Sequence, residues 1–422
     1  MNSPLNYTTK AQWLSFLEQA HIKEIDLGLS RISKVFESLK LPRPKKIFTC
    51  AGTNGKGSTL RMLELLALEQ NMTVGKYTSP HLIDFNERIA INDQNVSDEL
   101  LIQGLKAVYQ AKGDISLTYF EYTTLVAFYL FAHLNLDIWL IEVGLGGRLD
   151  ASNCIDADVS IVTSIALDHA DWLGTDLDVI RFEKCGIGRS NKPLVLGQDV
   201  FTADLEQRLD TYFNPMPLLY NASKNFHWKE LDENHFEIHI QKEGQIIEFT
   251  DLIKPKLPIN NACCALSAWF LAGFNCDIEQ MKAVLSQWKL AGRLTEIIKN
   301  DVTYTIDVGH NAHAAEFIAQ QIPKQDVCIL GMMADKDVMS VTQSLKNVAK
   351  TFIIVDLPLP RAIKKEKLKQ YIDKPCITAN SVQDALNKID NMHVQSVLIC
   401  GSFITCGLAF EVLEQNINEE TT

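Results

Sequence analysis

The sequence predicts an α/β protein of two domains, each built around a mainly parallel sheet. Three observations lead to this prediction: the length of the chain, the alternation of short apolar runs with helical periodicity, and a second alternating block after a change of pattern. A chain of 422 residues is too long for one ordinary hydrophobic core, so two or three domains are expected. Near-continuously apolar strands that alternate with helices are typical of a parallel sheet covered on both faces.

The first alternating block contains four candidate strands. They are KIFTCAG from Lys45 or Lys46, TVGKYTS ending at Ser79, DIWLIEVGLG from Asp137 and VSIVTSI from Val159. Between the first two lies STLRMLELLALEQ, whose apolar residues follow the spacing of one helix face. From about Phe226 to Leu252 the sequence alternates in the manner of hairpins, which predicts an antiparallel edge or insertion.

The second alternating block begins after Gly292. Its candidate strands are TYTIDV, VCILGMM, TFIIVDL and SVLICGS, separated by helical or mixed segments. At about 130 residues, the block is long enough to hold its own core. The boundary is predicted at WKLAGR, Trp288 to Arg293. We therefore expect one domain over residues 1–288, another over residues 294–422, and a cleft between them.

Composition and charge exclude several classes of function. The net charge of −12 argues against broad nucleic-acid or membrane-surface binding, although a local basic pocket for phosphates is compatible with it. The longest apolar run, around Leu125 to Leu134, has about half of the roughly 20 residues that a membrane span requires. The N-terminal sequence MNSPLNYTTK has no basic segment followed by an apolar one. We expect a cytoplasmic protein with no nucleic-acid and no membrane partner.

The cysteines indicate a reducing environment. The chain has 10 of them, none in a C-x-x-C pair, and several lie inside apolar strand-like runs, such as Cys50, Cys328 and Cys400. The spacings of zinc sites and disulfide frameworks are missing, so we expect buried, reduced thiols.

The sharpest local pattern is AGTNGKGST, Ala51 to Thr59, which follows an apolar strand and opens a helix. Glycines let several backbone N–H groups face one anion, the helix N-terminus adds its positive dipole end, and Lys56 adds a full charge. The strict G-x-x-x-x-G-K-[ST] pattern is not met, because Cys50 occupies the first glycine position and Gly57 follows the lysine. A glycine-rich turn that caps a helix is the alternative. We interpret the segment as a nucleotide-binding loop.

The loop GTNGKGS resembles the ATP loop of the Mur-type amide ligases, and especially that of the folylpolyglutamate synthases. Further segments resemble this family and follow its order along the chain: IDLGLSR, YTSPHL, FNERI, ISLTYFEYTTL, EVGLGGRLDASN, SIALDHADWLG, EKCGI, LAGR, DVGHNAHAAE, GMMADKD and CGSFIT. Together they run from residue 25 to residue 405, and they are similar to the bacterial bifunctional dihydrofolate synthase/folylpolyglutamate synthases. Two positions depart from the family pattern: Cys185 stands where alanine is frequent, and Ala312 where proline is frequent.

The resemblance implies a Mur ligase-like fold, with an N-terminal P-loop-type parallel sheet carrying an antiparallel addition and a C-terminal Rossmann-like domain. It implies a monomeric, ATP- and Mg²⁺-dependent ligase that joins L-glutamate to dihydropteroate, giving dihydrofolate, and adds further glutamates to tetrahydrofolates through an acyl phosphate. The N-terminal domain is expected to bind ATP and the pterin, and the C-terminal domain to close over ATP and glutamate. Negative charge accumulates in such a reaction, so the site needs cations and aimed donors more than a nucleophilic side chain.

Three residues are candidate magnesium ligands: Ser79, Glu142 and His169. Each is predicted at the C-terminal end of a candidate strand, the edge of a parallel sheet where the phosphate loop also lies. Taken alone, they could be a helix cap, a surface acid and a hydrogen-bonded loop residue, although an unpaired acid after WLI would be costly to bury. The resemblance implies the metal role for all three and a catalytic role for His169. A histidine is an unusual ligand for magnesium, which prefers oxygen.

Lys56 and Lys184 are the other residues expected to be catalytic. Taken alone, Lys184 is an ordinary surface lysine on a helix. The resemblance implies that carbon dioxide carbamylates it, which turns a cation into an anion with two oxygens. The lysine must first lose its proton, and burial or nearby cations favour that loss.

The remaining contacts to ATP are also implied by the resemblance. The full set of expected ATP-binding residues is Thr53, Asn54, Gly55, Lys56, Gly57, Ser58, Asn261, Arg293, Asp307 and His310. A strand-end helix cap is the alternative for Asp307, and a structural histidine is the alternative for His310.

The pterin-bearing substrate is expected in the first domain. The resemblance implies contacts from three segments: Glu24, Ile25, Asp26 and Leu27; Thr118, Tyr119, Phe120 and Glu121; and Leu149, Asp150 and Ala151. Two aromatic rings offer flat apolar faces, and three carboxylates can accept from pterin N–H groups. Without the resemblance, TYFEY is a strand or helix face packed in a core.

Two other functions compete with this interpretation. A Mur ligase of cell-wall synthesis shares the fold, the loop and the lysine, but it is disfavoured by LTYFEY and IDLGLSR and by the lack of a separate N-terminal uridine-nucleotide domain. A regulatory nucleotide-binding module without turnover is disfavoured because phosphate loop, metal residues and lysine occur together.

Overall fold

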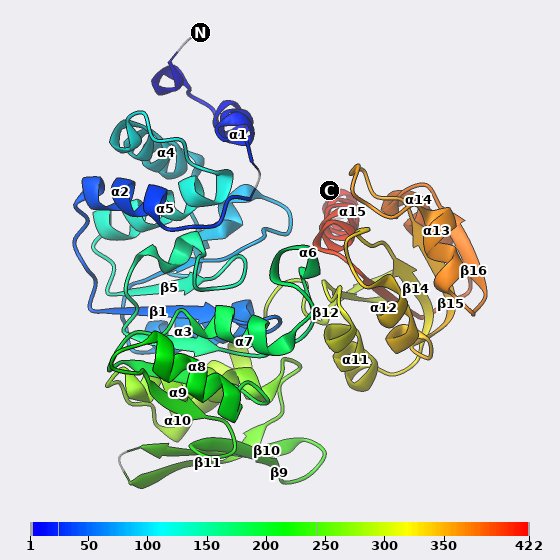
Figure 1. Ribbon diagram of the computed structural model, residues 1–422. Helices are drawn as coiled ribbons and strands as arrows, with labels where there is room; N and C mark the ends of the chain where they lie inside the picture. Colours follow the sequence, from blue (N-terminus) through cyan, green and yellow to red (C-terminus); the bar gives the residue numbers. More distant parts are fainter. Residues whose placement is uncertain (1–2, 24, 243, 421–422) are drawn as a thin grey trace. The chain divides into compact units, whose positions relative to one another are not determined.

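The computed structural model describes residues 3–23, 25–242 and 244–420, with side chains described as far as Leu413. By their contacts these residues form two compact units (Figure 1). The first comprises residues 1–80, 85–165 and 173–288, and the second comprises residues 81–84, 166–172 and 289–422. Two short internal segments thus belong to the second unit, a division that the sequence did not indicate. No helix in the described part of the chain has the length and apolar character of a membrane span.

The first unit is built on an eight-stranded sheet in the order β4-β3-β2-β5-β1-β6-β7-β8. The four predicted strands are confirmed as β1 (Lys46–Ala51), β2 (Val74–Tyr77), β5 (Ile138–Glu142) and β6 (Val159–Val162). They pair in parallel with one another and with β7 (Pro193–Leu196) and β8 (Leu218–Asn221). The remaining edge is antiparallel and consists of β3 (Ile89–Ile91) and β4 (Gln94–Asn95).

Helices cover both faces of this sheet because its strands are apolar on both sides. In β1, Ile47 joins the core beneath α2 (Ser30–Leu39), α4 (Asp98–Lys112) and α5 (Tyr119–His133). The next residue, Phe48, stacks on Trp269 of α9 (Ile259–Leu271) at a centroid distance of 6.2 Å. α3 (Lys56–Glu69) packs beside α9 and α10 (Ile278–Gln287) on that second face. α7 (Leu177–Cys185) and α8 (Ala203–Tyr212) cover β6 and β7.

The hairpin-like segment forms a separate antiparallel sheet of three strands. These are β9 (Phe226–Glu230), β10 (His235–Lys242) and β11 (Gln245–Ile253), in the order β11-β10-β9. The sheet packs against α9, as Figure 1 shows at the foot of the first unit. The sequence left open whether this segment is an edge or an insertion, and the structure shows an insertion.

The second unit is a six-stranded sheet in the order β12-β13-β17-β14-β15-β16. All neighbours pair in parallel except β12 (Thr295–Lys299), which is antiparallel to β13 (Val302–Asp307). The other strands are β14 (Gln325–Leu330), β15 (Ala349–Val355), β16 (Cys376–Ala379) and β17 (Ser396–Cys400). α11 (Ala312–Gln321) and α12 (Val338–Leu345) cover one face, and α14 (Val382–Ile389) and α15 (Phe403–Glu420) cover the other. This arrangement confirms the predicted Rossmann-like domain and adds β12 and β16 to the strands expected.

Candidate active site

The predicted phosphate loop joins the end of β1 to the start of α3. Its backbone has φ values of 146° at Gly52 and 90° at Gly55, which residues with a side chain rarely adopt. A Cβ at Gly55 would also lie 2.6 Å from the side-chain oxygen of Asn261. Both the backbone conformation and the lack of space therefore favour glycine at this position. α3 begins at Lys56 without a side-chain cap at its N-terminus, so its first N–H groups face the loop as in known anion sites.

Three other segments hold this loop in place. The Asn261 amide of α9 donates to Ser58 Oγ at 2.9 Å, and the Trp288 indole donates to the Ser58 carbonyl at 2.8 Å. On the other side, the backbone N–H of Thr53 donates to the carbonyl of Ser164 at 2.9 Å. The loop conformation is therefore fixed by the protein itself.

Glu142 and Ser79 lie beside the loop lysine. Glu142 ends β5, is 6% exposed, and has its Oε1 3.8 Å from Lys56 Nζ. Its Oε2 accepts from the backbone N–H of Ser79, which follows the adjacent strand β2, at 3.2 Å. Lys56 Nζ also donates to the carbonyl of Gly52 at 3.1 Å. The alternative of a surface acid is therefore wrong for Glu142.

Lys184 is the third charged residue at the loop. It lies in the last turn of α7, is 6% exposed, and its Nζ donates to the carbonyl of Gly52 at 3.3 Å. A Cβ at Gly147 would lie 2.8 Å from the Lys184 carbonyl, so the turn after β5 lies directly against this helix end. The alternative of an exposed surface lysine is wrong. Lys56 and Lys184 thus meet at the Gly52 carbonyl, and Glu142 lies beside Lys56, so three different elements bring charged side chains to the loop.

His169 does not occupy the position expected from the sequence. β6 ends at Val162, and the following residues turn to support the phosphate loop, because Thr163 Oγ1 donates to the Asn54 carbonyl at 2.6 Å. His169 comes later, is exposed, has a φ of 53°, and belongs by its contacts to the second unit. The expectation that it ends a strand is wrong, while its metal role stays a prediction.

The predicted ATP contacts of the second unit gather at the end of β13. Asp307, the last residue of this strand, is buried, and its carboxylate accepts from the backbone N–H groups of Leu294 at 3.0 Å and Gly309 at 2.8 Å. Burial raises the pKa of Asp307, against the opposing charge of Arg293, whose guanidinium lies 3.9 Å away. Asp307 therefore holds the turn at Leu294, before β12, and the turn at Gly309, after β13, in addition to any role towards a ligand.

His310 is tied to residues of the same unit through both ring nitrogens. Its Nδ1 lies 3.0 Å from the Val308 carbonyl, and its Nε2 lies 3.3 Å from Asp168 Oδ2. A structural role is thereby shown for this histidine, and its contact with ATP stays a prediction.

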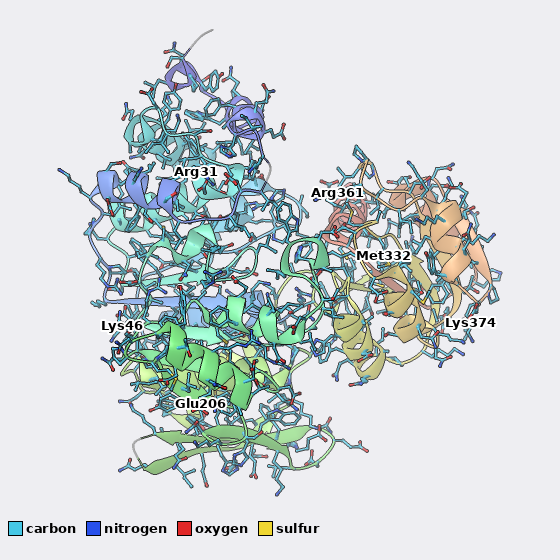
Figure 2. All side chains as sticks on the ribbon, viewed as in Figure 1. Arg31, Lys46, Glu206, Met332, Arg361 and Lys374 are labelled. Carbon is cyan, nitrogen blue, oxygen red and sulfur yellow. The ribbon has the colours of Figure 1, made fainter. Side chains whose placement is uncertain are left out.

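The structure brings the three predicted pterin segments together. Arg31, labelled in Figure 2, pairs with Asp26 Oδ2 at 2.6 Å and with Glu121 Oε1 at 3.2 Å. The backbone N–H of Gly28 donates to the carbonyl of Leu149 at 3.2 Å. The Lys23 ammonium, with help from Arg31, lowers the pKa of Asp26. Glu24 lies outside the described residues.

Other residues that are expected to contact the pterin also have partners within the protein. Thr118 and Glu121 form the capping box at the start of α5, so TYFEY belongs to a helix. The Asp150 carboxylate accepts from the backbone N–H of Leu145 at 2.8 Å, and burial raises the pKa of Asp150. The Phe120 ring lies against Gly144, where a Cβ would come within 2.6 Å of it. These contacts hold Thr118, Phe120, Glu121 and Asp150 in place within the first unit.

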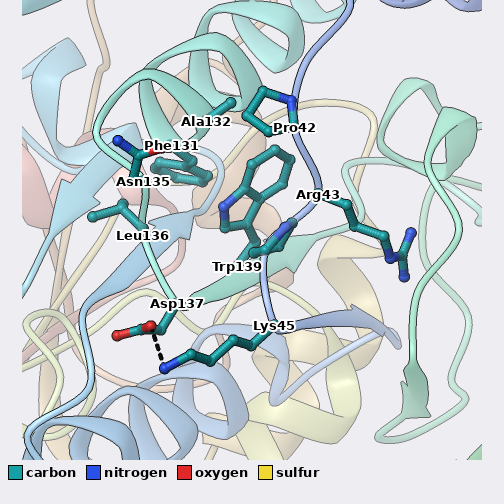
Figure 3. A pocket seen from close by; sticks show the side chains of 10 residues that line it. Pro42, Arg43, Lys45, Phe131, Ala132, Asn135, Leu136, Asp137 and Trp139 are labelled. Carbon is teal, nitrogen blue, oxygen red and sulfur yellow. Dashed lines mark ion pairs between the residues drawn. The ribbon is translucent and has the colours of Figure 1, made fainter.

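A cavity of about 180 Å³ lies at the other end of the same sheet (Figure 3). Trp139 and Phe131 form part of its wall, and an ion pair of 2.7 Å between Lys45 and Asp137 lies at its edge. The cavity adjoins the starts of β1 and β5, whereas the phosphate loop and Glu142 follow the ends of these strands. It is therefore separate from the candidate active site.

Sequence reasoning missed two charged groups that organise these regions. Arg31 contacts the carboxylate of Glu121, 90 positions further along the sequence, and only its presence in IDLGLSR could have indicated it. Lys336 of GMMADKD pairs with Asp168 at 2.6 Å, a contact between segments far apart in the chain. Neither pairing has a local pattern, so both required the structure.

Comparisons with known proteins agree with this geometry. The family model described as "Mur ligase, glutamate ligase domain" matches residues 292–403. A dihydrofolate synthase/folylpolyglutamate synthase of Escherichia coli (strain K12) is 37% identical over 415 residues, which cover 96% of this chain and 95% of the relative.

Solved structures resemble the chain over nearly its whole length. E. coli FolC in complex with DHPP and ADP has a TM-score of 0.91 and 35% identity, covering 99% of this chain and 100% of that one. The bifunctional folylpolyglutamate synthase/dihydrofolate synthase from Yersinia pestis, complexed with AMPPNP and Mn ion, has a TM-score of 0.90 and 32% identity. That match covers 98% of this chain and 100% of the other.

Proposed function

The chain belongs to the dihydrofolate synthase/folylpolyglutamate synthase family of the Mur ligase superfamily, and from this premise we propose how its residues perform the reaction of that family. It is an ATP-dependent ligase that joins L-glutamate to dihydropteroate and adds further glutamates to reduced folates. The γ-phosphate of ATP is transferred to the substrate carboxylate and ADP is released. The amine of glutamate then attacks the carbonyl carbon of the acyl phosphate, displaces inorganic phosphate and loses a proton.

The observation that supports these roles best is the convergence of Lys56, Glu142 and Lys184 on the phosphate loop. Negative charge grows on the transferring phosphate and then on the tetrahedral intermediate, so fixed cations and N–H donors stabilise both transition states. Lys56 and the first turn of α3 supply these groups, and Asn261 holds the loop in the required shape. Arg293, Asp307 and His310 of the second unit complete the proposed ATP contacts.

A divalent cation accompanies the ATP analogue in a solved relative. The Glu142 carboxylate is a hard oxygen donor of the kind Mg²⁺ prefers, and Ser79, whose backbone N–H donates to that carboxylate, carries a hydroxyl of the same kind. The described residues contain no group of three His, Cys, Asp or Glu that could hold a metal ion. We place Mg²⁺ at Ser79 and Glu142, with His169 as a further ligand; when bound, it neutralises charge on the phosphates.

We assign Lys184 to catalysis as a carbamate. Its amine is buried beside the Gly52 carbonyl, and carbamylation is the attack of an amine on carbon dioxide. The attack forms an N–C bond and releases one proton from the nitrogen, leaving an anion with two oxygens. This anion would face the same loop that Lys56 serves.

We place the pterin against Ile25–Leu27, Thr118–Glu121 and Leu149–Ala151. The support is that the hydrogen bond between Gly28 and Leu149 and the ion pairs of Arg31 join these segments. The exposed Leu27 and the half-buried Phe120 offer apolar surface for a flat ring.

The test is a parallel incubation of the protein with ATP, Mg²⁺ and L-glutamate. The acceptors are dihydropteroate, a reduced folate and a UDP-muramyl acid, and the products are identified by mass. We expect one glutamyl addition to dihydropteroate and one or more to the folate. Ligation to the muramyl acid alone would overturn the assignment in favour of a cell-wall ligase, and no ligation at all would favour a regulatory module.

A further inference from the structure

Asp168 is the centre of a charged cluster that lies wholly within the second unit. Its Oδ1 pairs with Lys336 Nζ at 2.6 Å and accepts from the backbone N–H of His169 at 2.9 Å. Its Oδ2 lies 3.3 Å from His310 Nε2 and 3.9 Å from His169 Nε2. One carboxylate thus contacts a lysine, two imidazoles and the backbone of the residue that follows it.

The pair at the centre of this cluster is almost excluded from water. The side chain of Asp168 is 9% exposed and that of Lys336 is 10% exposed. Removal of one partner from such a pair leaves a buried charge without compensation, so the pair is held strongly once formed. Lys336 also lies 3.9 Å from Asp335, but that carboxylate is 39% exposed and screened by solvent. Asp168 is therefore the main partner of Lys336.

The pair fixes a segment whose chain neighbours belong to the other unit. Residues 166–172 group with the second unit, whereas Ile165 and Leu173 on either side of them group with the first. Asp168 attaches this segment to residues after β13 and β14, through His310 and Lys336 respectively. The backbone of His169, with its φ of 53°, is held by the same carboxylate. Asp168 therefore helps to hold the backbone of His169.

We propose that Asp168, held by Lys336, is a positioning residue for His169 and so controls how tightly the enzyme binds its divalent cation. The proposal rests on the metal role proposed above for His169. Histidines that ligate metals are commonly oriented by a carboxylate that contacts the ring from outside the coordination sphere. Asp168 fits this description by position, because its Oδ2 lies 3.9 Å from His169 Nε2, beyond hydrogen-bond distance, and its Oδ1 accepts from the His169 backbone N–H at 2.9 Å.

The test compares the full-length protein with the variants Asp168→Asn, Lys336→Met, Lys336→Arg and His169→Ala. Asp171→Asn is the matched control, since Asp171 is an exposed acid of the same segment. The first measurement is Mn²⁺ binding in the presence of AMPPNP, followed by the electron paramagnetic resonance signal of free Mn²⁺. The second is hydrogen exchange of peptides covering residues 166–172. Circular dichroism establishes that each variant is folded.

We expect Asp168→Asn and Lys336→Met to weaken Mn²⁺ binding about 10-fold or more, in the range typical of losing an outer-sphere partner. Their 166–172 peptides should exchange faster, Lys336→Arg should restore both properties, and Asp171→Asn should leave both unchanged. A cluster that only stabilises the fold would instead lower the thermal midpoint without changing Mn²⁺ binding.

The outcomes separate this inference from the proposed function. Weakened binding in His169→Ala with unchanged binding in Asp168→Asn and Lys336→Met would overturn the inference alone. Unchanged binding in His169→Ala would remove His169 from the metal site, and the inference would fall with it.

Discussion

The side-chain nitrogen of Lys184 lies 3.3 Å from the carbonyl oxygen of Gly52, where β1 gives way to the phosphate loop. α7 and β1 are separated by more than 100 positions in the sequence, so this contact is a property of the folded unit. It places a second lysine at the loop that already carries Lys56. Glu142 lies 3.8 Å from Lys56 and is the acid of this group of charged residues.

Lys56→Met should abolish ATP-dependent ligation in a folded protein. The variant keeps the length of the side chain but loses the charge that stabilises the transferring phosphate, which should reduce turnover by about 10²-fold or more. Glutamate-dependent release of ADP measures the effect, with Lys224→Met as an exposed control in the same unit. Turnover near that of the wild type would remove the phosphate-loop assignment.

Glu142→Gln should raise the Mg²⁺ concentration needed for half-maximal turnover. The amide keeps the shape of the side chain but loses the charge that attracts the cation. The increase should be at least the roughly 10–100-fold change seen when an outer-sphere partner is lost. A Mg²⁺ titration at saturating ATP measures it, and Glu69→Gln, an exposed acid of the same unit, is the control. An unchanged titration would move the metal elsewhere.

Lys184→Ala should lose ligation activity and regain part of it with small added carboxylates, which can take the place of the carbamate. Lys184→Arg should remain inactive, because arginine keeps the positive charge and stays protonated. Crystals grown with bicarbonate provide an independent measurement. Density for an unmodified lysine at high resolution would contradict the carbamate.

Phe120→Ala should impair dihydrofolate synthesis more than polyglutamylation. The two substrates differ by one glutamyl unit, yet each must present its carboxylate to the same γ-phosphate, so the pterin cannot occupy one place in both. The difference should be about 1–3 kcal/mol in kcat/KM, the usual value of a lost buried contact. Asp26→Ala should behave alike, and Asp114→Ala, an exposed acid, should affect neither reaction. Equal losses in both reactions would indicate one shared pterin position.

Asp326→Asn should destabilise the second unit in a pH-dependent manner. Lys350 and the backbone N–H groups of Gln395 and Ser396 lower the pKa of Asp326 to about 2. This value lies below that of an unfolded aspartate, about 3.9, so the stabilisation is complete above pH 4 and is lost as the pH falls towards 2.

The variant should therefore be less stable than the wild type by about 1 kcal/mol at pH 7, after allowance for solvent screening. Denaturant unfolding at pH 7, 5 and 3 measures the difference, which should be equal at the first two values and smaller at the third. Asp373→Asn, at a mostly exposed acid, is the control. A difference that grows towards low pH would contradict the sign.

Local sequence patterns were sufficient to predict the strands and glycine turns that position the phosphate loop. β1, β2 and β5 have continuous apolar runs, and the glycines at 52 and 55 mark turns that only glycine accepts easily. The end of β6 could not be predicted. The residues Thr163, Ser164 and Ile165 look like a continuation of the strand, but the Ser164 carbonyl accepts from the backbone N–H of Thr53 in the phosphate loop and not from a neighbouring strand. Whether a strand continues depends on what lies beside it, and a single segment does not contain that information.

The partners of the buried or half-buried acids within the protein could not be predicted either. Asp26, Glu121, Asp150 and Asp307 were expected to face ligands, yet each also has a partner within the protein. A sequence indicates that an acid lies near a site, but it does not indicate which cation or N–H group the acid contacts.

Because residues 81–84 and 166–172 belong to the second unit, they also decide how the protein can be divided into fragments. Leu82 packs into the core beside β13 and β17, and Asp168 pairs with Lys336, so the second unit is completed by pieces that precede Lys289 by more than 100 positions. A fragment that starts at Lys289 would lack both pieces and would expose the surfaces they cover. The second unit therefore cannot be separated from the first by cutting the chain at a single peptide bond. Two fragments made by splitting the gene at Lys289 should depend on each other to fold.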